Sequence, residues 1–222
     1  MNISILLPYK ENYSPNYAGA VSLFVHQTYF KSKFRNNIKI FGNTSYNSKL
    51  SSNYINLELI NKSFLESQSK YYVNKFIEFQ KKNVSDIIEI HNRPNYLKLI
   101  ESLNSKIVLY FHNDPLEMEG SKNINERIYL IYKCEKIIFN STWSKSRFIH
   151  GLEKFYSSSP KLEIINQCIN KKKVNINIKH KLITFVGKLN KAKGYDLFGK
   201  AIIRVLNKYP NCKANVIGDE PR

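Results

Sequence analysis

Short apolar segments alternate along this chain of 222 residues with segments whose apolar positions recur every three or four residues. Short apolar runs are typical of buried strands, and the longer spacing is typical of amphipathic helices. Strand-like runs lie at 3–8, 38–41, 55–60, 86–91, 106–112, 136–140 and 161–169. Helical spacing is found at 19–34, 64–82, 95–104, 123–134 and 142–152, the last with Ser141 well placed as its N-cap. This alternation predicts an α/β fold, a Rossmann-like doubly wound parallel sheet with helices on both faces.

The last part of the chain repeats this pattern on a smaller scale. We expect an N-terminal domain of residues 1–170, a polar and basic linker of residues 171–181, and a partial C-terminal domain of residues 182–222. The partial domain holds a single βαβ unit, with strands at 182–188 and 213–219 and a helix at 194–208. One such unit leaves both faces of its small sheet poorly covered, so we expect the rest of a second domain to be missing.

The composition is that of a globular protein, with 42% hydrophobic and 23% charged residues. No apolar run approaches the roughly 18 residues that span a bilayer, and the first residues lack the basic region and length of a signal peptide, so we expect a cytoplasmic protein. The three cysteines are far apart and match neither a disulfide framework nor a zinc site, so they predict reduced thiols and no metal centre.

The net charge of +18 suggests either nucleic acid or an anionic membrane surface as a partner. The charge is spread over both parts of the chain. Lys, Asn, Ile, Tyr and Phe all have codons made only of A and T, and all are abundant, so genomic composition accounts for much of it. We therefore expect no specific nucleic-acid partner and, at most, a peripheral contact with an anionic membrane at its inner face.

Ligands of open parallel sheets bind beyond the carboxyl ends of the strands, and polar residues gather at those positions in this chain. His112 follows one strand, where a titratable ring suits catalysis, although a histidine hydrogen-bonded within a loop is the alternative. Arg93 follows another strand and either meets an anionic acceptor or holds its loop by a salt bridge. Gly19 permits close backbone approach by a ligand, or simply begins a helix.

The stretch "FVGKLNKAKG" leads from a strand into a helix. Gly187 lets the chain leave the strand without a side chain in the way of a ligand, and Gly194 begins a helix whose positive end favours an anion. Lys188 and Lys193 lie on the two sides of the turn, where together they suit a diphosphate. The alternative is an ordinary turn with two solvated lysines.

Residues 185–219 resemble the opening of the donor domain of family 4 glycosyltransferases, which have the GT-B fold and usually read GR(L)xxxKG here. Lys193 stands at the family's Lys, whereas Lys188 stands at the usual Arg and can act only as a point charge. The resemblance continues upstream through the glycine-containing loop at 17–20, the strand that ends at His112, and "IIFNSTWSKSRF". It covers essentially the whole chain.

The resemblance implies roles for individual residues. In that family the two basic residues hold the pyrophosphate of a sugar nucleotide, and the histidine lies by the donor sugar. We therefore expect three catalytic residues, His112, Lys188 and Lys193. The donor-binding set is Gly19, Gly187, Lys188, Lys193 and Gly194, and the acceptor-binding set is Tyr17, Arg93, Asn113 and Lys122.

The implied activity is transfer of a hexose from a nucleotide-sugar to a glycan or lipid-linked acceptor of the cell-envelope polysaccharide or lipopolysaccharide type, with retention at the anomeric carbon and without a metal or other cofactor. The family's later acidic motif, E(x)7E, has no match after Leu182, so we expect a truncated chain that is inactive alone. A non-catalytic module that binds sugar phosphates or polyanions is the alternative. An oxidoreductase is disfavoured because no GxGxxG follows the first strand.

Overall fold

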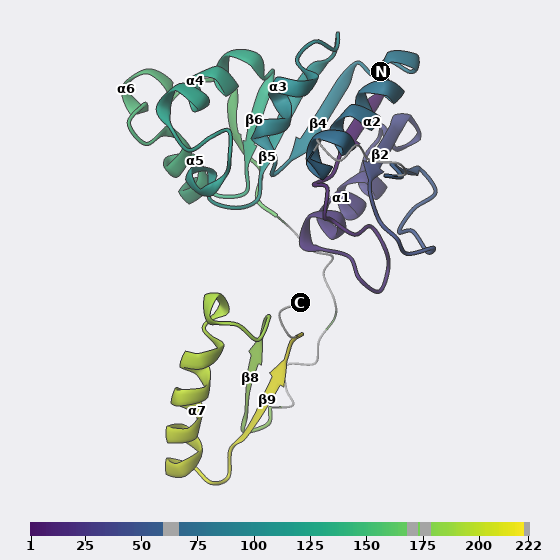
Figure 1. The fold of residues 1–222 in the computed structure, drawn as a ribbon. Coiled ribbons are helices and arrows are strands. Elements are labelled where there is room, and N and C mark those ends of the chain that lie inside the picture. Colours follow the sequence, from purple (N-terminus) through teal and green to yellow (C-terminus); the bar gives the residue numbers. More distant parts are fainter. Residues whose placement is uncertain (60–66, 168–172, 174–178, 220–222) are drawn as a thin grey trace. The chain divides into compact units, whose positions relative to one another are not determined.

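The computed structural model describes residues 1–59, 67–167, 173 and 179–219. The chain divides into two compact units, residues 1–169 and 170–222, and each is described here by itself (Figure 1). The expected linker is residues 171–181, and most of it lies outside the described residues.

The first unit is built on a seven-stranded sheet with the strand order β3-β2-β1-β4-β5-β6-β7. All neighbouring strands in it pair in parallel. The strands are β1 (Ile3–Leu6), β2 (Ile38–Gly42), β3 (Tyr54–Asn56), β4 (Ile87–His91), β5 (Lys106–Phe111), β6 (Lys136–Phe139) and β7 (Leu162–Ile164). The chain winds outward from β1 to β3 and then resumes on the other side of β1 with β4. The predicted doubly wound parallel sheet is therefore confirmed.

Helices cover both faces of this sheet because successive side chains of each strand point to opposite faces. Ile5 and Leu7 pack with Val21 and Val25 of α1 (Ala20–Lys31) in the smaller core. Leu6 belongs to the larger core on the other face. The helices that contribute to this larger core are α2 (Gln68–Lys82), α3 (Leu97–Ile100), α4 (Ile124–Lys133) and α5 (Thr142–Ile149). The remaining short helices of this unit are α6 (Glu153–Tyr156) and the 3-10 turns η1 (Arg35–Asn37), η2 (Pro94–Tyr96) and η3 (Pro115–Glu117).

The expected helix 142–152 is shorter than its pattern predicts. It begins as expected, with the Ser141 side chain accepting a hydrogen bond from the Ser144 N–H, but it ends at Ile149. Gly151 adopts a left-handed conformation with φ of 79°, which stops the helix, and α6 follows separately. The buried guanidinium of Arg127 donates hydrogen bonds to the carbonyl oxygens of Phe148 and His150, just before Gly151. These bonds stabilise the end of the helix at this point.

The expected strand 161–169 is also shorter, since only Leu162–Ile164 pairs with β6. The Ile165 N–H still donates to Phe139, but beyond it the described chain leaves the sheet. The expected residues 168 and 169 lie outside the described part of the chain.

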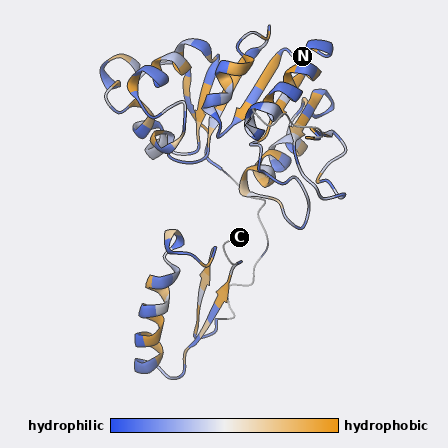
Figure 2. Cartoon of the chain, in the orientation of Figure 1, coloured by the Kyte–Doolittle hydropathy of each residue, from blue (hydrophilic) through white to orange (hydrophobic). Residues whose placement is uncertain are grey.

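The second unit contains β8 (Leu182–Val186), the 3-10 turn η4 (Lys191–Lys193), α7 (Tyr195–Lys208) and β9 (Lys213–Ile217). The two strands pair in parallel, with Phe185 opposite Val216. The Phe185 ring packs on α7, 5.2 Å from the Phe198 ring centre. Hydrophobic residues lie along both strands and on α7 (Figure 2). Some of their side chains remain exposed, for example Val186 at 73% and Leu197 at 66%.

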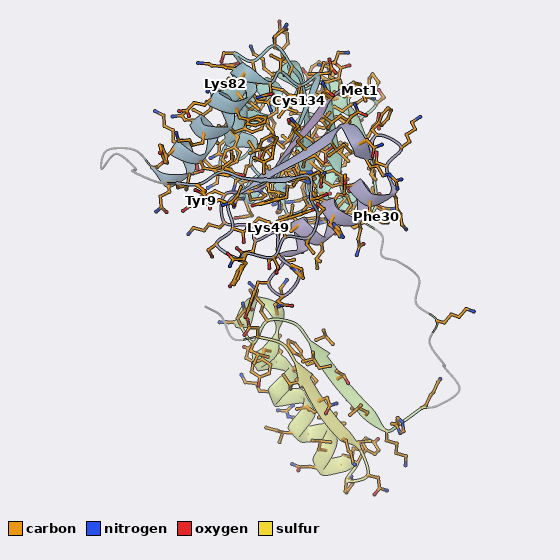
Figure 3. All side chains as sticks on the ribbon, turned by 90° about the vertical axis from the view of Figure 1, so that its right-hand side faces the viewer. Met1, Tyr9, Phe30, Lys49, Lys82 and Cys134 are labelled. Carbon is orange, nitrogen blue, oxygen red and sulfur yellow. The ribbon has the colours of Figure 1, made fainter. Side chains whose placement is uncertain are left out.

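Two of the three cysteines fall within the described residues, and both are free thiols. Cys134 is buried in the larger core of the first unit (Figure 3), and burial raises the pKa of its thiol to about 12. Cys212 is half-buried. None of the helices in the described ranges has both the length and the apolar composition needed to cross a membrane.

Candidate functional site

The winding of the first unit's sheet reverses between β1 and β4, and this reversal marks where a ligand is expected in an open α/β sheet. The carboxyl ends of β1, β4, β5 and β6 lie along one edge there, because neighbouring strands are parallel. The expected site residues of the first unit follow these strand ends.

Two histidines meet at this edge. The alternation of side chains places Glu89 and His91 on the same face of β4, and it places His112, just past β5, on the same face as Tyr110. His91 lies opposite Tyr110 in the parallel register. The Nδ1 atom of His91 is consequently 2.7 Å from the Nε2 atom of His112, and both rings are buried.

A carboxylate and an amide extend this pair into a chain of hydrogen bonds. Glu89 Oε1 lies 2.6 Å from His91 Nε2, and Gln167 Nε2 lies 2.5 Å from His112 Nδ1. A carboxylate can only accept a hydrogen bond, so Glu89 sets the direction of the chain, and the nitrogen of the Gln167 amide faces His112 in agreement with it. Gln167 donates to Nδ1 of His112, and Nε2–H of His112 donates to Nδ1 of His91. His91 in turn donates to Glu89. We call these four residues the histidine chain.

The backbone of His112 is also fixed. Its N–H donates to Oδ1 of Asn92 at 2.8 Å, and its carbonyl accepts from Nδ2 of Asn140 at 2.7 Å. Burial of the ring, together with the nearby His91, lowers the pKa of His112 to about 3. His112 is therefore neutral at physiological pH, and it can orient a ligand by hydrogen bonding without carrying a charge.

Aromatic rings enclose the two imidazoles. The Tyr110 ring stacks on both, with ring centres 5.5 Å from His91 and 4.4 Å from His112. Phe24 of α1 meets His112 edge to face at 5.0 Å. The faces of the two imidazole rings therefore pack against aromatic rings, and their polar contacts are made by the ring nitrogens.

Glu89 and Gln167 were not expected from the sequence. A sequence signal for Glu89 did exist, because a carboxylate inside an otherwise apolar parallel strand needs a polar partner. Gln167 gave no such signal, since it lies beyond β7 in a stretch without a clear pattern.

Gly19 is the N-cap of α1, as expected for a glycine at a helix start, but a protein side chain lies beside it. Oε1 of Glu11 accepts a hydrogen bond from the Ser22 N–H at 3.0 Å. A Cβ atom on Gly19 would lie only 2.0 Å from this oxygen, so the carboxylate fits because the residue is glycine. In this structure the positive end of α1 is therefore matched by Glu11.

Two of the expected acceptor-binding residues lie together. Arg93 and Asn113 line a hollow of 390 Å³ beyond β4 and β5. Arg93 donates to the carbonyl oxygen of Asn92, at 2.8 Å, and has no ion pair within the described part of the chain. The salt bridge in this hollow belongs instead to Asp114, which binds Arg147 at 2.9 Å.

The other two expected acceptor residues lie apart from that pair. Lys122 lines a neighbouring groove of 1410 Å³, which shares Asn95 and Glu119 with the hollow. Tyr17 lies in the loop before α1, where its ring stacks on Tyr46 with ring centres 4.3 Å apart.

The remaining expected residues form the turn between β8 and α7 in the second unit. Gly194 has a left-handed backbone with φ of 74° and is the N-cap of α7. No side chain of the described residues caps this helix end. Lys193 lies just before it, and its Cβ is 3.7 Å from the place where a Cβ on Gly187 would lie. The ammonium groups of Lys188 and Lys193 make no ion pair among the described residues, and both side chains are exposed.

No protein-family model matches the chain, and no curated protein sequence does either. Several solved structures match it in fold. Anabaena HepE in complex with UDP-glucose has a TM-score of 0.65 and 15% identity, over 99% of this chain and 61% of that one. An Escherichia coli structure described as trehalose-6-phosphate bound with UDP-2-fluoro glucose has a TM-score of 0.56 and 12% identity, over 100% of this chain and 65% of that one.

A third match, to a UDP-N-acetylglucosamine 2-epimerase, has a TM-score of 0.51 and 8% identity, over 96% of this chain and 63% of that one. The chain thus spans about three fifths of the length of the solved structures that it matches. At these identities the likeness shows the fold alone, and the fold is that of the GT-B glycosyltransferases.

Proposed function

We propose that this protein binds a nucleotide-sugar and takes part in transferring its hexose to an acceptor. The observation that carries the proposal is the strand, turn and helix from β8 to α7. Within the described residues, its two lysines have no ion pair and the start of α7 has no side-chain cap, and solved structures with a similar fold include complexes with UDP-glucose and UDP-2-fluoro glucose. A diphosphate is the ligand group that such a turn suits best, because its charge is matched by the lysines and by the helix end.

In this proposal the two units have different tasks. Lys188 and Lys193 neutralise the charge that builds on the departing diphosphate, and Gly187 and Gly194 let the backbone approach it. In the first unit, His112 is assigned to orient the sugar through hydrogen bonds, and Gly19 to the donor-binding set. No side chain is assigned as a covalent nucleophile, which agrees with a front-face displacement that retains the anomeric configuration. No metal is required by this scheme.

The acceptor is proposed to lie over the hollow and groove of the first unit. Arg93 and Asn113 flank the strand ends, Lys122 lies further along the groove, and Tyr17 offers an exposed ring in the loop before α1. Polar side chains beside aromatic rings suit a glycan or a lipid-linked sugar. The reaction would then belong to cell-envelope polysaccharide or lipopolysaccharide synthesis at the inner face of the membrane.

Titration calorimetry with UDP-glucose and with UDP tests this proposal. We expect Lys193→Ala to weaken both ligands by about 10- to 150-fold, because a charge-assisted hydrogen bond contributes about 1.5 to 3 kcal/mol. Lys191→Ala is the matched control, since it removes the same charge from the same short helix. Binding that neither variant weakens, or that both weaken equally, would contradict a specific diphosphate site at Lys193.

A second candidate function, a non-catalytic module for sugar phosphates or polyanions, is favoured by the net charge of +18. In such a module the affinity for a polyanion would depend on the total charge of the protein. Lys191→Ala and Lys193→Ala would therefore weaken the binding equally.

A further inference from the structure

The histidine chain determines which nitrogen of His112 is offered to a ligand. We propose that Glu89 and His91 are positioning residues that hold His112 in the tautomer with a lone pair on Nδ1, and that Gln167 occupies this nitrogen until a hydroxyl of the bound sugar replaces it. The identity of the ligand in this inference rests on the proposed function. The tautomer of His112 does not depend on that function.

Glu89 is the group that gives the chain its direction. Two neutral imidazoles can share one hydrogen bond in either direction, and the amide of Gln167 can present its nitrogen or its oxygen. A carboxylate has no such choice, because it only accepts. A neutral His91 therefore directs its Nε2–H toward Glu89, at 2.6 Å, and its Nδ1 accepts a hydrogen bond from Nε2–H of His112.

Aromatic side chains surround the two rings. Both rings are buried, and they are enclosed by Tyr110 and by Phe24. Glu89 is the one charged side chain bonded to them among the described residues. In a reversed chain the lone pair on Nε2 of a neutral His91 would face the Glu89 carboxylate at 2.6 Å, and two acceptors at that distance repel each other. The buried rings therefore favour the tautomer that Glu89 selects.

Gln167 lies on the open side of this arrangement. His112 is 9% exposed, whereas Gln167 is an exposed residue on the chain that follows β7. Its amide donates to Nδ1 of His112, at 2.5 Å, and so takes the position of a ligand that donates a hydrogen bond. A part-buried hydrogen bond between two neutral groups makes only a small net contribution to stability, so a ligand that forms an equivalent bond can replace it.

The tautomer limits what can replace the amide. A lone pair on Nδ1 accepts a hydrogen bond from a hydroxyl, but it repels a group that only accepts, such as a carboxylate or a fully ionised phosphate oxygen. Nδ1 of His112 would therefore bind a sugar hydroxyl and exclude an anionic group.

Nitrogen-detected NMR of the whole chain, labelled with 15N-histidine, tests the positioning role without any ligand. His112→Gln assigns the signals. We expect the wild-type His112 to carry its proton on Nε2 alone. In Glu89→Gln the new amide can donate or accept, so both tautomers should appear. Glu163→Gln is the matched control, because Glu163 lies on β7 and its carboxylate pairs with Lys136, whereas the hydrogen bonds of the two rings among the described residues go to Glu89, Gln167 and each other. A proton on Nδ1 in the wild type, or a single unchanged tautomer in Glu89→Gln, would overturn the positioning role.

Calorimetry with UDP-glucose and UDP tests the role of Gln167. Removing the competing amide in Gln167→Ala should strengthen UDP-glucose binding about two- to tenfold and leave UDP binding unchanged, since UDP has no sugar to place at His112. Equal gains for both ligands, or no gain for either, would overturn this role. If the wild-type chain binds neither ligand, the proposed function fails and the role of Gln167 fails with it, while the NMR result still decides the tautomer.

Discussion

At the scale of single residues, His112 couples folding to pH. Its pKa is lowered to about 3 in the folded chain, while an unfolded histidine titrates near 6.5. Between these values the unfolded chain binds a proton that the folded chain does not, so stability falls as the pH falls below about 6.5 and is constant above it. The slope contributed by this ring is at most about 1.4 kcal/mol per pH unit.

Urea unfolding of the wild type and of His112→Asn at several pH values between 5 and 8 measures this contribution. We expect the wild type to lose more stability than the variant as the pH is lowered. Parallel curves for the two proteins would show that His112 takes up its proton as readily when folded as when unfolded.

His112 also shows which features of the site can be predicted from the sequence. His112 could be placed at a site because it directly follows an apolar run, and the carboxyl ends of parallel strands face ligands. Its bond to His91 could not be foreseen, because it depends on the register that sets His91 opposite Tyr110. Gln167 depends further on the path of the chain after β7, which no local pattern specifies.

At the scale of elements, α7 offers a comparison between two glycines. Gly194 begins the helix with a φ of 74°, which disfavours a residue with a Cβ. Gly199 lies inside the helix, where an added Cβ would enter open space among the described residues. We expect Gly194→Ala to destabilise α7 by about 1 kcal/mol and Gly199→Ala to stabilise it by about 0.5 to 1 kcal/mol. Amide hydrogen exchange of α7 measures both effects. Changes of the same sign would mean that the left-handed start of the helix is not needed.

The elements themselves were largely predictable, because periodicity reports burial on one side of a helix or strand. Most paired strands and the long helices of the first unit occur where the apolar patterns placed them, and the seven-stranded parallel sheet follows from their alternation. Two elements are shorter than expected, since the strand expected at 55–60 is Tyr54–Asn56 and the helix expected at 95–104 is Leu97–Ile100. The ends were less predictable, since tertiary contacts decide them. The apolar pattern continues to Leu152, yet α5 ends at Ile149, where Arg127 binds the corner carbonyls and Gly151 turns the chain.

At the scale of the whole molecule, the net charge of +18 separates the two candidate functions. A site that binds a diphosphate depends on a few lysines, so its affinity for the diphosphate should change only modestly with salt concentration. A polyanion-binding surface releases many counterions, and six to ten phosphate contacts would reduce its affinity by about 10³ to 10⁵ between 50 and 200 mM salt.

Binding of UDP-glucose and of a short DNA duplex, each measured by calorimetry at 50 and 200 mM NaCl, distinguishes these cases. We expect UDP-glucose to remain bound at the higher salt and the duplex to be released, because general attraction between a basic protein and a polyanion is screened over about 10 Å at 0.1 M salt. Lys193→Ala should then weaken the binding of UDP-glucose by the same roughly 10- to 150-fold and leave the weak duplex binding at low salt nearly unchanged. Tight duplex binding at 50 mM NaCl, without any binding of UDP-glucose, would instead favour the polyanion-binding module.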